Sequence, residues 1–417
     1  MMEQPLHPKW ASPKHTPTPP LPPQRGRVRV GGGSRGVSKL SVQNEKGKPG
    51  IKRSTQAIID LKAIAHNVSE VRKRVGRRRD LMAVVKADGY GHGSVEVSRT
   101  ALRNGANCLG VATPEEGQQL REAGIDVPIL VLGLIQPEEA YKVVDFNLEQ
   151  AICSLELAEE LNQLASNAGT RINIHIKLDT GMGRVGLVPK DALTFAKRVS
   201  RFKKLNLKGI FSHFSCADEV DKNSARKQIE IFGRLVQDIE ASGIKIPKKH
   251  IANSAGVLDL PESYYDLVRP GIMIYGLYPS NEVSHRIELK PAMAFITKVI
   301  FVKRVPAGCP ISYGRTFTTQ KETIVATLPV GYADGYNRLL SGQGEVLIKG
   351  RRVPLMGRIC MDMCMIDVSD VKNVQPGDRV ILFGKGLPVD EMAEKIGTIN
   401  YEVVCAVGKR VPRVYVE

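Results

Sequence analysis

The feature that most constrains this fold is a regular alternation of short apolar runs with amphipathic segments between residues 56 and 285. Strands that alternate with helices indicate βαβ units and a parallel sheet. The apolar runs predict strands over 81–86, 108–112, 128–133, 150–153, 172–177, 207–212, 249–252 and 268–275. Helical spacing predicts helices over 93–104, 114–123, 137–145, 155–167, 189–202 and 221–242.

The even spacing of these units favours a closed (β/α)8 barrel of the TIM type. An open doubly wound sheet is the alternative, but no clear Gly-x-Gly-x-x-Gly turn is present. After about residue 285 the helices nearly vanish, and short strands between Gly, Pro and Asp residues predict a compact β domain. Its strands are predicted over 294–304, 323–328, 345–349, 352–356 and 374–383, and residues 57–60 can add another. We therefore predict a barrel over 56–285 and a β domain over 286–417.

The charge of the chain is unevenly distributed. The 417 residues have a formal net charge of +17, of which residues 1–55 contribute +9. This stretch also holds nine prolines and few apolar residues, so it cannot bury enough surface to offset its chain entropy. We predict a disordered basic tail over 1–55. Because the rest of the chain carries only +8 and no recognition motif, nucleic-acid binding is not expected.

Targeting, membrane and disulfide signals are weak. The chain lacks the apolar segment of a secretory signal, and no apolar run approaches the roughly 20 residues of a membrane-spanning helix. Seven scattered cysteines do not form a disulfide pattern, and Cys360 and Cys364 lack a second pair of zinc ligands. We expect a soluble cytoplasmic protein with free thiols, no metal site and no membrane association.

Polar residues follow the ends of several predicted strands, where a barrel carries its active site. Lys86 precedes a Gly-rich turn, and Lys177, His213 and Arg269 occupy comparable places further along the chain. Each one alone is compatible with an ordinary surface or core residue. Together, a reactive amine, anion-binding glycines and cationic groups suggest a phosphorylated carbonyl cofactor, and pyridoxal phosphate is the simplest choice.

A set of segments in this order resembles the alanine racemases, the fold-type III pyridoxal phosphate family, over about residues 57–417. The segments are AVVKADGYGHG (83–93), KLDTGMGRVG (177–186), SHF (212–214), HIANSAG (250–256), VRPGIMIYG (268–276), ISYGRTF (311–317), LPVGYADGYNR (328–338), GRICMDMCMIDVS (357–369) and NYE…RVPR (400–413). The resemblance implies an N-terminal barrel, a C-terminal β domain and a head-to-tail homodimer in which each site is completed by the partner's β domain.

The resemblance also implies which residues bind the cofactor. Lys86 would hold pyridoxal phosphate covalently, and Arg269 would face its pyridine nitrogen. A guanidinium cannot accept a proton, so the ring would be a weaker electron sink than one paired with Asp. The phosphate would be bound by Tyr90, Ser254 and the backbone of Gly271 and Ile272.

Racemisation needs a proton donor and acceptor on each face of the substrate Cα. By resemblance, Lys86 serves one face, Tyr313 from the other subunit serves the opposite face, and His213 links that tyrosine towards Arg269. The substrate would be held by Arg184, which Lys177 orients, and by the backbone N–H of Met361. Lys177 occupies the position of a lysine that is carbamylated in many family members.

Further positions match the family less directly. Tyr332 would narrow the entrance, although ordinary packing of the β domain explains it nearly as well. The entry corridor would include Asp218, Arg338 and Arg358, and ordinary packing of the β domain explains the two arginines nearly as well. Lys409 is a departure, because several family members carry a phosphate-binding tyrosine before the RVPR segment.

The expected activity is therefore the interconversion of L-alanine and D-alanine, with D-alanine supplied to peptidoglycan. A racemase of serine or of another small amino acid is the main alternative. A non-catalytic cofactor-binding protein with the same barrel is a second one, but such proteins lack the C-terminal β domain.

Overall fold

The computed structural model describes residues 53–417. Eight parallel strands form a nearly closed barrel in the order β8-β7-β6-β5-β4-β3-β2-β9. Between β8 and β9, the Arg269 N–H donates to the Ala252 carbonyl at 2.9 Å. The strands are β2 (Asp80–Val84), β3 (Cys108–Val111), β4 (Ile129–Val131), β5 (Glu149–Ile152), β6 (Ile172–Lys177), β7 (Leu205–Phe211), β8 (Lys248–His250) and β9 (Leu267–Val268). The predicted TIM-type barrel is confirmed.

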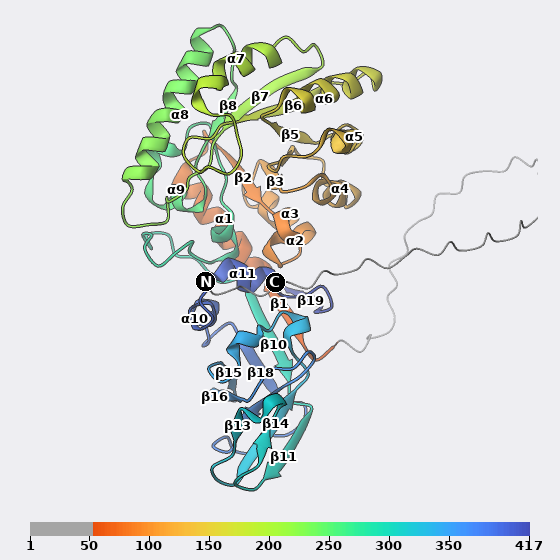
Figure 1. Ribbon diagram of the computed structural model, residues 1–417, viewed down its shortest axis with the longest axis vertical. Helices are drawn as coiled ribbons and strands as arrows, with labels where there is room; N and C mark the ends of the chain where they lie inside the picture. Colours follow the sequence, from red (N-terminus) through yellow and green to blue (C-terminus); the bar gives the residue numbers. More distant parts are fainter. Residues whose placement is uncertain (1–52) are drawn as a thin grey trace, which may run out of the picture. The chain divides into compact units, whose positions relative to one another are not determined.

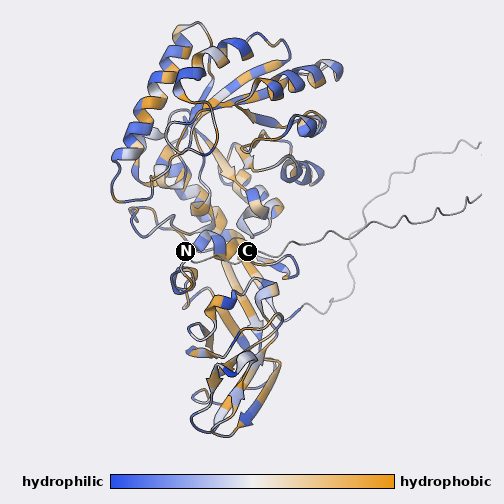
Figure 2. Ribbon diagram, in the orientation of Figure 1, coloured by the Kyte–Doolittle hydropathy of each residue, from blue (hydrophilic) through white to orange (hydrophobic). Residues whose placement is uncertain are grey.

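Helices lie outside the barrel strands (Figure 1), and several of them begin at a residue whose side chain caps the first turn. Ser154 accepts a hydrogen bond from the first turn of α6, and Thr113 does the same for α4. The helical ribbons alternate between hydrophilic and hydrophobic residues (Figure 2), and the apolar face is buried. The helices are α1 (Leu61–Val75), α2 (Lys86–Tyr90), α3 (Ser94–Arg103), α4 (Pro114–Glu122), α5 (Ala140–Asp145), α6 (Leu155–Asn167), α7 (Pro189–Val199), α8 (Asn223–Ala241) and α9 (Ser254–Asp259). All the predicted helices are confirmed; α1, α2 and α9 were not predicted.

The C-terminal part is a mainly β domain, as predicted, with strand order β11-β14-β17-β16-β15-β18-β10-β1-β19. The early strand β1 (Gln56–Asp60) pairs antiparallel with β10 and parallel with β19, which confirms the predicted strand at 57–60. The others are β10 (Met293–Lys298), β11 (Phe301–Val305), β14 (Thr323–Leu328), β15 (Glu345–Ile348), β16 (Arg351–Met356), β17 (Cys364–Asp367), β18 (Arg379–Phe383) and β19 (Arg413–Val416), beside a separate pair, β12 (Pro310–Ile311) and β13 (Phe317–Thr318). Two short helices, α10 (Val389–Lys395) and α11 (Asn400–Cys405), follow β18. The boundary near residue 285 stays a prediction.

Three predicted strands were wrong in extent. The strand predicted over 374–383 begins only at Arg379, because Pro376 and Gly377 form a turn before it. The strand predicted over 268–275 ends at Val268, because Pro270 has no N–H for the ladder and the chain then turns into the short 3-10 helix η3 (Ile272–Tyr275). The segment 294–304 forms two strands, because its backbone pairs with the start of β18 at Val299 and with β14 from Ile300 onward.

The predicted tail lies outside the described residues up to residue 52. Its last residues do not fit the prediction of disorder to residue 55. The Thr55 side chain is buried and hydrogen-bonds that of Thr297 in β10 at 2.9 Å. Among the described residues, no helix is long and apolar enough to cross a membrane.

Candidate active site

Nine of the residues predicted from strand ends and motifs line one cavity of about 510 Å³. This volume is within the range of about 300–1,000 Å³ typical of small-molecule sites. The nine residues are Lys86, Tyr90, Lys177, Arg184, His213, Ser254, Arg269, Gly271 and Ile272. They come from loops that follow different barrel strands, so the fold collects them at the carboxyl ends of the sheet.

Lys86 starts the short helix α2, directly after β2. The loop that carries it is unusual, because Ala87, Asp88 and Tyr90 all have φ angles near +50°. Two carboxylates support this backbone: Glu116 accepts a hydrogen bond from the Ala87 N–H at 2.6 Å, and Asp88 accepts one from a backbone N–H at the start of α3. Burial lowers the pKa of the Lys86 amine, and the positive charge of Arg184 lowers it further.

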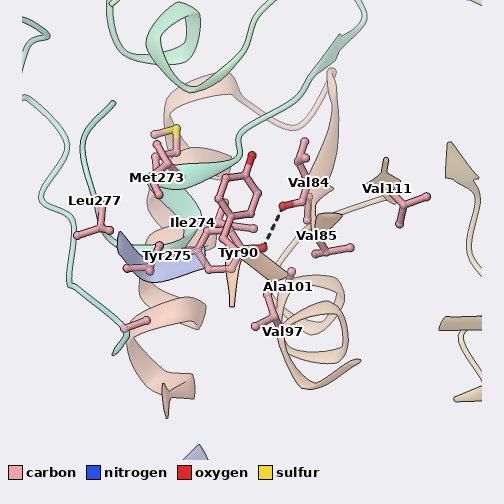
Figure 3. Packing of buried hydrophobic residues seen from close by; sticks show 14 of the residues in the cluster. Val84, Val85, Tyr90, Val97, Ala101, Val111, Met273, Ile274, Tyr275 and Leu277 are labelled. Atoms are coloured by element: carbon pink, nitrogen blue, oxygen red, sulfur yellow. Dashed lines mark hydrogen bonds between the residues drawn. The ribbon is translucent and has the colours of Figure 1, made fainter. Parts of the chain in front are cut away.

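Aromatic packing holds the same loop from behind. The Tyr90 ring lies 4.8 Å from the ring of the fully buried Tyr275, whose hydroxyl donates to the Val84 carbonyl at 3.0 Å (Figure 3). His92, which is on the same loop as Tyr90, has its ring 4.6 Å from the Tyr275 ring. The position of Lys86 is therefore coupled to a well-packed aromatic cluster between β2 and η3.

A cradle of small groups lies beside Tyr90. Ser254 accepts a hydrogen bond from the Gly271 N–H at 2.9 Å, and Asn253 caps α9. A Cβ atom at Gly271 would lie only 2.5 Å from the Tyr90 hydroxyl, so only glycine leaves room there. A hydroxyl, a phenol and close backbone suit a phosphate group, and the amine of Lys86 suits a carbonyl. The donor set therefore fits pyridoxal phosphate.

Arg269 lies almost fully buried at the side of the cavity. Its guanidinium donates to the carbonyl oxygens of Ser212 at 2.7 Å and Ile251 at 3.2 Å, and to Nδ1 of His250 at 2.9 Å. It also lies 3.4 Å from Nδ1 of His213. Burial lowers the pKa of Arg269, which nevertheless remains a pure donor, and burial together with the charge of Arg269 lowers the pKa of His213. His213 is therefore a neutral ring beside a fixed cation.

Lys177 ends β6 and is 3% exposed. Its amine donates to the Leu178 carbonyl at 2.8 Å and lies 5.2 Å from the centre of the Phe211 ring. Burial and the nearby charge of Arg269 lower its pKa to about 8. Arg184 is exposed and reaches the cavity from a turn in which the Asp179 carboxylate accepts three backbone N–H groups.

Two predicted site residues do not line this cavity. Tyr313 and Met361 belong to the β domain, and their side chains are 70% and 53% exposed. Tyr313 follows Ser312, whose φ is +66°, and precedes Gly314, where an added Cβ would lie 2.9 Å from the Arg358 side chain. Such a strained and exposed backbone is typical of a functional turn.

Tyr332 lies on the same side of the β domain as Met361. Its N–H donates to the Cys360 carbonyl, and a Cβ at Gly331 would lie 2.3 Å from the carbonyl oxygens of Cys360 and Met361. Further exposed apolar side chains in these loops are those of Leu339 and Met363. Asp218, Arg338 and Arg358 are also not among the residues that line the cavity.

Sequence reasoning missed Tyr401 and Cys405, which reach the cavity from α11. The Tyr401 ring lies 6.0 Å from that of Tyr90. Lys409, at the position where the family resemblance led us to expect a phosphate-binding tyrosine, is exposed and outside the lining. The signal was nevertheless present, because Tyr401 belongs to the NYE segment.

Comparisons with known proteins agree with this geometry. Residues 59–279 match the model of the alanine racemase N-terminal domain, and residues 292–415 match that of the alanine racemase C-terminal domain. An alanine racemase of Desulforamulus reducens is 48% identical over 369 residues, which are 88% of this chain and 100% of that protein. One of Methanococcus maripaludis is 47% identical over 365 residues, 86% of this chain and 98% of that protein.

Solved structures of the same kind superimpose closely. An alanine racemase of Clostridium difficile 630 has a TM-score of 0.86 at 37% identity and covers 88% of this chain and 97% of its own. The alanine racemase from the D-cycloserine producer Streptomyces lavendulae has a TM-score of 0.83 at 37% identity, with the same coverage of both chains.

Proposed function

Because this chain belongs to the alanine racemase family, we propose that it interconverts L-alanine and D-alanine with pyridoxal phosphate as cofactor. The observation that supports this most strongly is the convergence of Lys86, Lys177, Arg184 and Arg269 on one cavity at the carboxyl ends of the barrel strands. Their chemistry suits a carbonyl, a phosphate and a substrate carboxylate in the same space.

Each cavity residue has a distinct task in this proposal. Lys86 has a lowered pKa, so a larger share of its amine is unprotonated and able to bind a carbonyl or take a proton. Arg269 offers only N–H donors, so an atom placed against it must accept. Pyridoxal phosphate, when bound, supplies an electron-withdrawing ring that stabilises negative charge at the substrate Cα.

The second proton-transfer group would come from another copy of the chain. Tyr313 is largely exposed and lies outside the cavity of its own barrel, and its neighbours Tyr332 and Met361 are also exposed. Exposed apolar side chains gathered in neighbouring loops mark an interaction surface. We infer a homodimer in which Tyr313 and Met361 complete the partner's site, with Tyr313 on the face of Cα opposite Lys86.

The first experiment measures racemisation of L-alanine by the full chain with and without added pyridoxal phosphate. Lys86→Ala should abolish both the activity and the visible absorbance of covalently bound cofactor, whereas Lys190→Ala on the exposed start of α7 should change neither. A Lys86→Ala protein that keeps the absorbance would refute the assignment. An amino-acid panel distinguishes alanine from serine or another small substrate.

The second experiment tests the two-subunit site. Tyr313→Phe should slow exchange of the Cα proton of one alanine enantiomer more than of the other, and Tyr141→Phe, at an exposed tyrosine of α5, is the control. Mixing inactive Lys86→Ala with impaired Tyr313→Phe should restore activity, because a mixed dimer contains one intact site. If the mixture is no more active than the two variants measured separately, Tyr313 does not act across subunits.

The proposal has a cellular consequence. A cytoplasmic enzyme of this kind would supply D-alanine for peptidoglycan. Expression of the chain in a bacterium that requires D-alanine should restore growth without it, and the Lys86→Ala variant should not.

A further inference from the structure

A row of buried polar side chains leads from Arg269 into the barrel, and the proposed mechanism does not use it. Its members are Glu149 of β5, His175 of β6 and His250 of β8, which are 8%, 1% and 0% exposed. Three contacts connect them: Arg269 Nη1 to His250 Nδ1 at 2.9 Å, His250 Nε2 to His175 Nδ1 at 2.9 Å, and His175 Nε2 to Glu149 Oε2 at 3.1 Å.

The chemistry of the two end groups, Arg269 and Glu149, makes all the hydrogen bonds of this row run in one direction. Arg269 can only donate, so Nδ1 of His250 must accept and must carry no proton. The proton of that neutral ring is then on Nε2, and it is donated to Nδ1 of His175. His175 in turn has its proton on Nε2 and donates it to the Glu149 carboxylate. Neither histidine can be doubly protonated without placing two donors face to face.

The far end of the row is a buried anion. Burial raises the pKa of Glu149, but the pKa is lowered overall, and the side-chain hydrogen bonds from His175 and Asn173 are among the causes. Asn173 donates to the second carboxylate oxygen at 3.0 Å. Glu149 is therefore an acceptor for His175 and the negative counterpart of the buried Arg269 cation.

We propose that Glu149 is a positioning residue for the reaction: by accepting from His175 it fixes the proton positions of both histidines and thereby keeps an accepting nitrogen of His250 on Arg269. This inference rests on the proposed function, because it is the proposed cofactor contact of Arg269 that gives the orientation of the guanidinium its importance. Without the carboxylate, His175 gains nothing from a proton on Nε2. Only Arg269 then opposes the other pair of tautomers, in which a His250 N–H would point at Arg269.

Three variants distinguish the effect of the Glu149 hydrogen-bond acceptor from the effect of its negative charge. Glu149→Leu removes the acceptor, Glu149→Gln keeps an oxygen acceptor without the charge, and Asn173→Ala removes a neighbouring contact but leaves His175 bonded. Because a buried N–H would lose its acceptor, we expect Glu149→Leu to lower kcat about ten-fold with little change in KM. Glu149→Gln and Asn173→Ala should stay within about three-fold of the wild type.

The tautomers are measured directly by magic-angle-spinning NMR on holoenzyme labelled with 15N-histidine, with resonances assigned from His175→Gln and His250→Gln. In the wild type and in Glu149→Gln both rings should be protonated on Nε2 only, and Glu149→Leu should change the His175 pattern. A proton on Nδ1 of His250 in the wild type would overturn the proposal. Equal losses of kcat in the Gln and Leu variants, or a Leu variant with unchanged tautomers and kcat, would also overturn it.

The readouts remain decisive in two difficult cases. If Glu149→Leu does not fold, the wild-type resonances and the Glu149→Gln kinetics still test the direction of the row. If the wild-type chain shows no racemase activity, the proposed function fails, but the histidine resonances still decide whether the hydrogen bonds run from Arg269 to Glu149.

Discussion

The reactivity of Lys177 towards carbon dioxide should depend on pH in a way that an ordinary lysine cannot reproduce. The amine is 3% exposed, and burial with the charge of Arg269 lowers its pKa to about 8. Only the unprotonated amine attacks CO2 to form a carbamate. At pH 7.5 a pKa of about 8 leaves about a quarter of the amine unprotonated, against about 0.1% at the ordinary pKa.

The expected rates follow from these fractions. At a fixed partial pressure of CO2, the initial rate of carbamate formation should rise about eight-fold between pH 6.5 and 7.5 and less than about 1.5-fold between pH 8.5 and 9.5. An amine with the ordinary pKa would still gain about nine-fold over the second interval. The plateau above pH 8.5 is therefore the diagnostic result.

The assay traps the carbamate by ethylation and quantifies it by peptide mass spectrometry. Lys372, an exposed lysine of the β domain, is the reference in the same digest, and Lys177→Arg should give no signal at position 177. Racemase activity should fall in CO2-depleted buffer and recover with CO2, because an anion at Lys177 can pair with Arg184. A rate that keeps rising about nine-fold per pH unit above pH 8.5 would refute the buried, cation-flanked environment of Lys177.

Three further variants test buried contacts in the barrel and in the β domain. Tyr275→Phe removes a buried hydroxyl donor that packs against the loop carrying Lys86, and it should lower the free energy of unfolding by about 1–2 kcal/mol. An unchanged midpoint of denaturant unfolding would contradict this. Asp334→Asn removes a buried carboxylate whose pKa is lowered, against the effect of burial, by hydrogen bonds from two arginines. It should cost about 2 kcal/mol at pH 7, and the deficit should shrink as pH falls below the ordinary value of 3.8; a constant deficit down to pH 3 would argue against that role. Gly91→Ala would place a Cβ 2.3 Å from a carbonyl of α11, whereas an added Cβ at Gly243, which has a similar positive φ, would meet nothing. The free energy of unfolding should therefore fall by about 2 kcal/mol more in Gly91→Ala than in Gly243→Ala. Equal thermal melts of the two variants would exclude the clash.

Site residues at strand ends could be predicted from the sequence, because a barrel brings the carboxyl ends of all its strands to one rim. Lys86, Lys177 and Arg269 follow or end apolar runs, and parallel strands direct all such positions to one rim. Their convergence therefore required only the correct number and order of strands. It did not require the register between them.

Residues whose position depends on register or on distant packing could not be placed. Glu149 comes just before the predicted run 150–153, and His175 lies inside the run 172–177. Their contact requires the actual pairing of β5 with β6, and the neighbouring pairing of β6 with β7 has an irregularity beside His175. Tyr401 reaches the cavity because α11 packs against α2, more than three hundred residues earlier in the chain. No local sequence pattern indicates such a contact.

The packing of α11 against α2 shows why the β domain matters to a site formed mainly by the barrel. Arg413 of β19 donates to the Gly91 carbonyl at 2.9 Å, and Gly91 itself lies close to the Val404 carbonyl of α11. The Lys86 loop contains several residues with positive φ, a conformation that persists only where its surroundings enforce it. Those surroundings include the C-terminal residues and the parallel pairing of β1 with β19. A barrel cut off before the β domain would therefore lose Tyr401 and part of the support for Lys86, even though it would keep all eight of its strands.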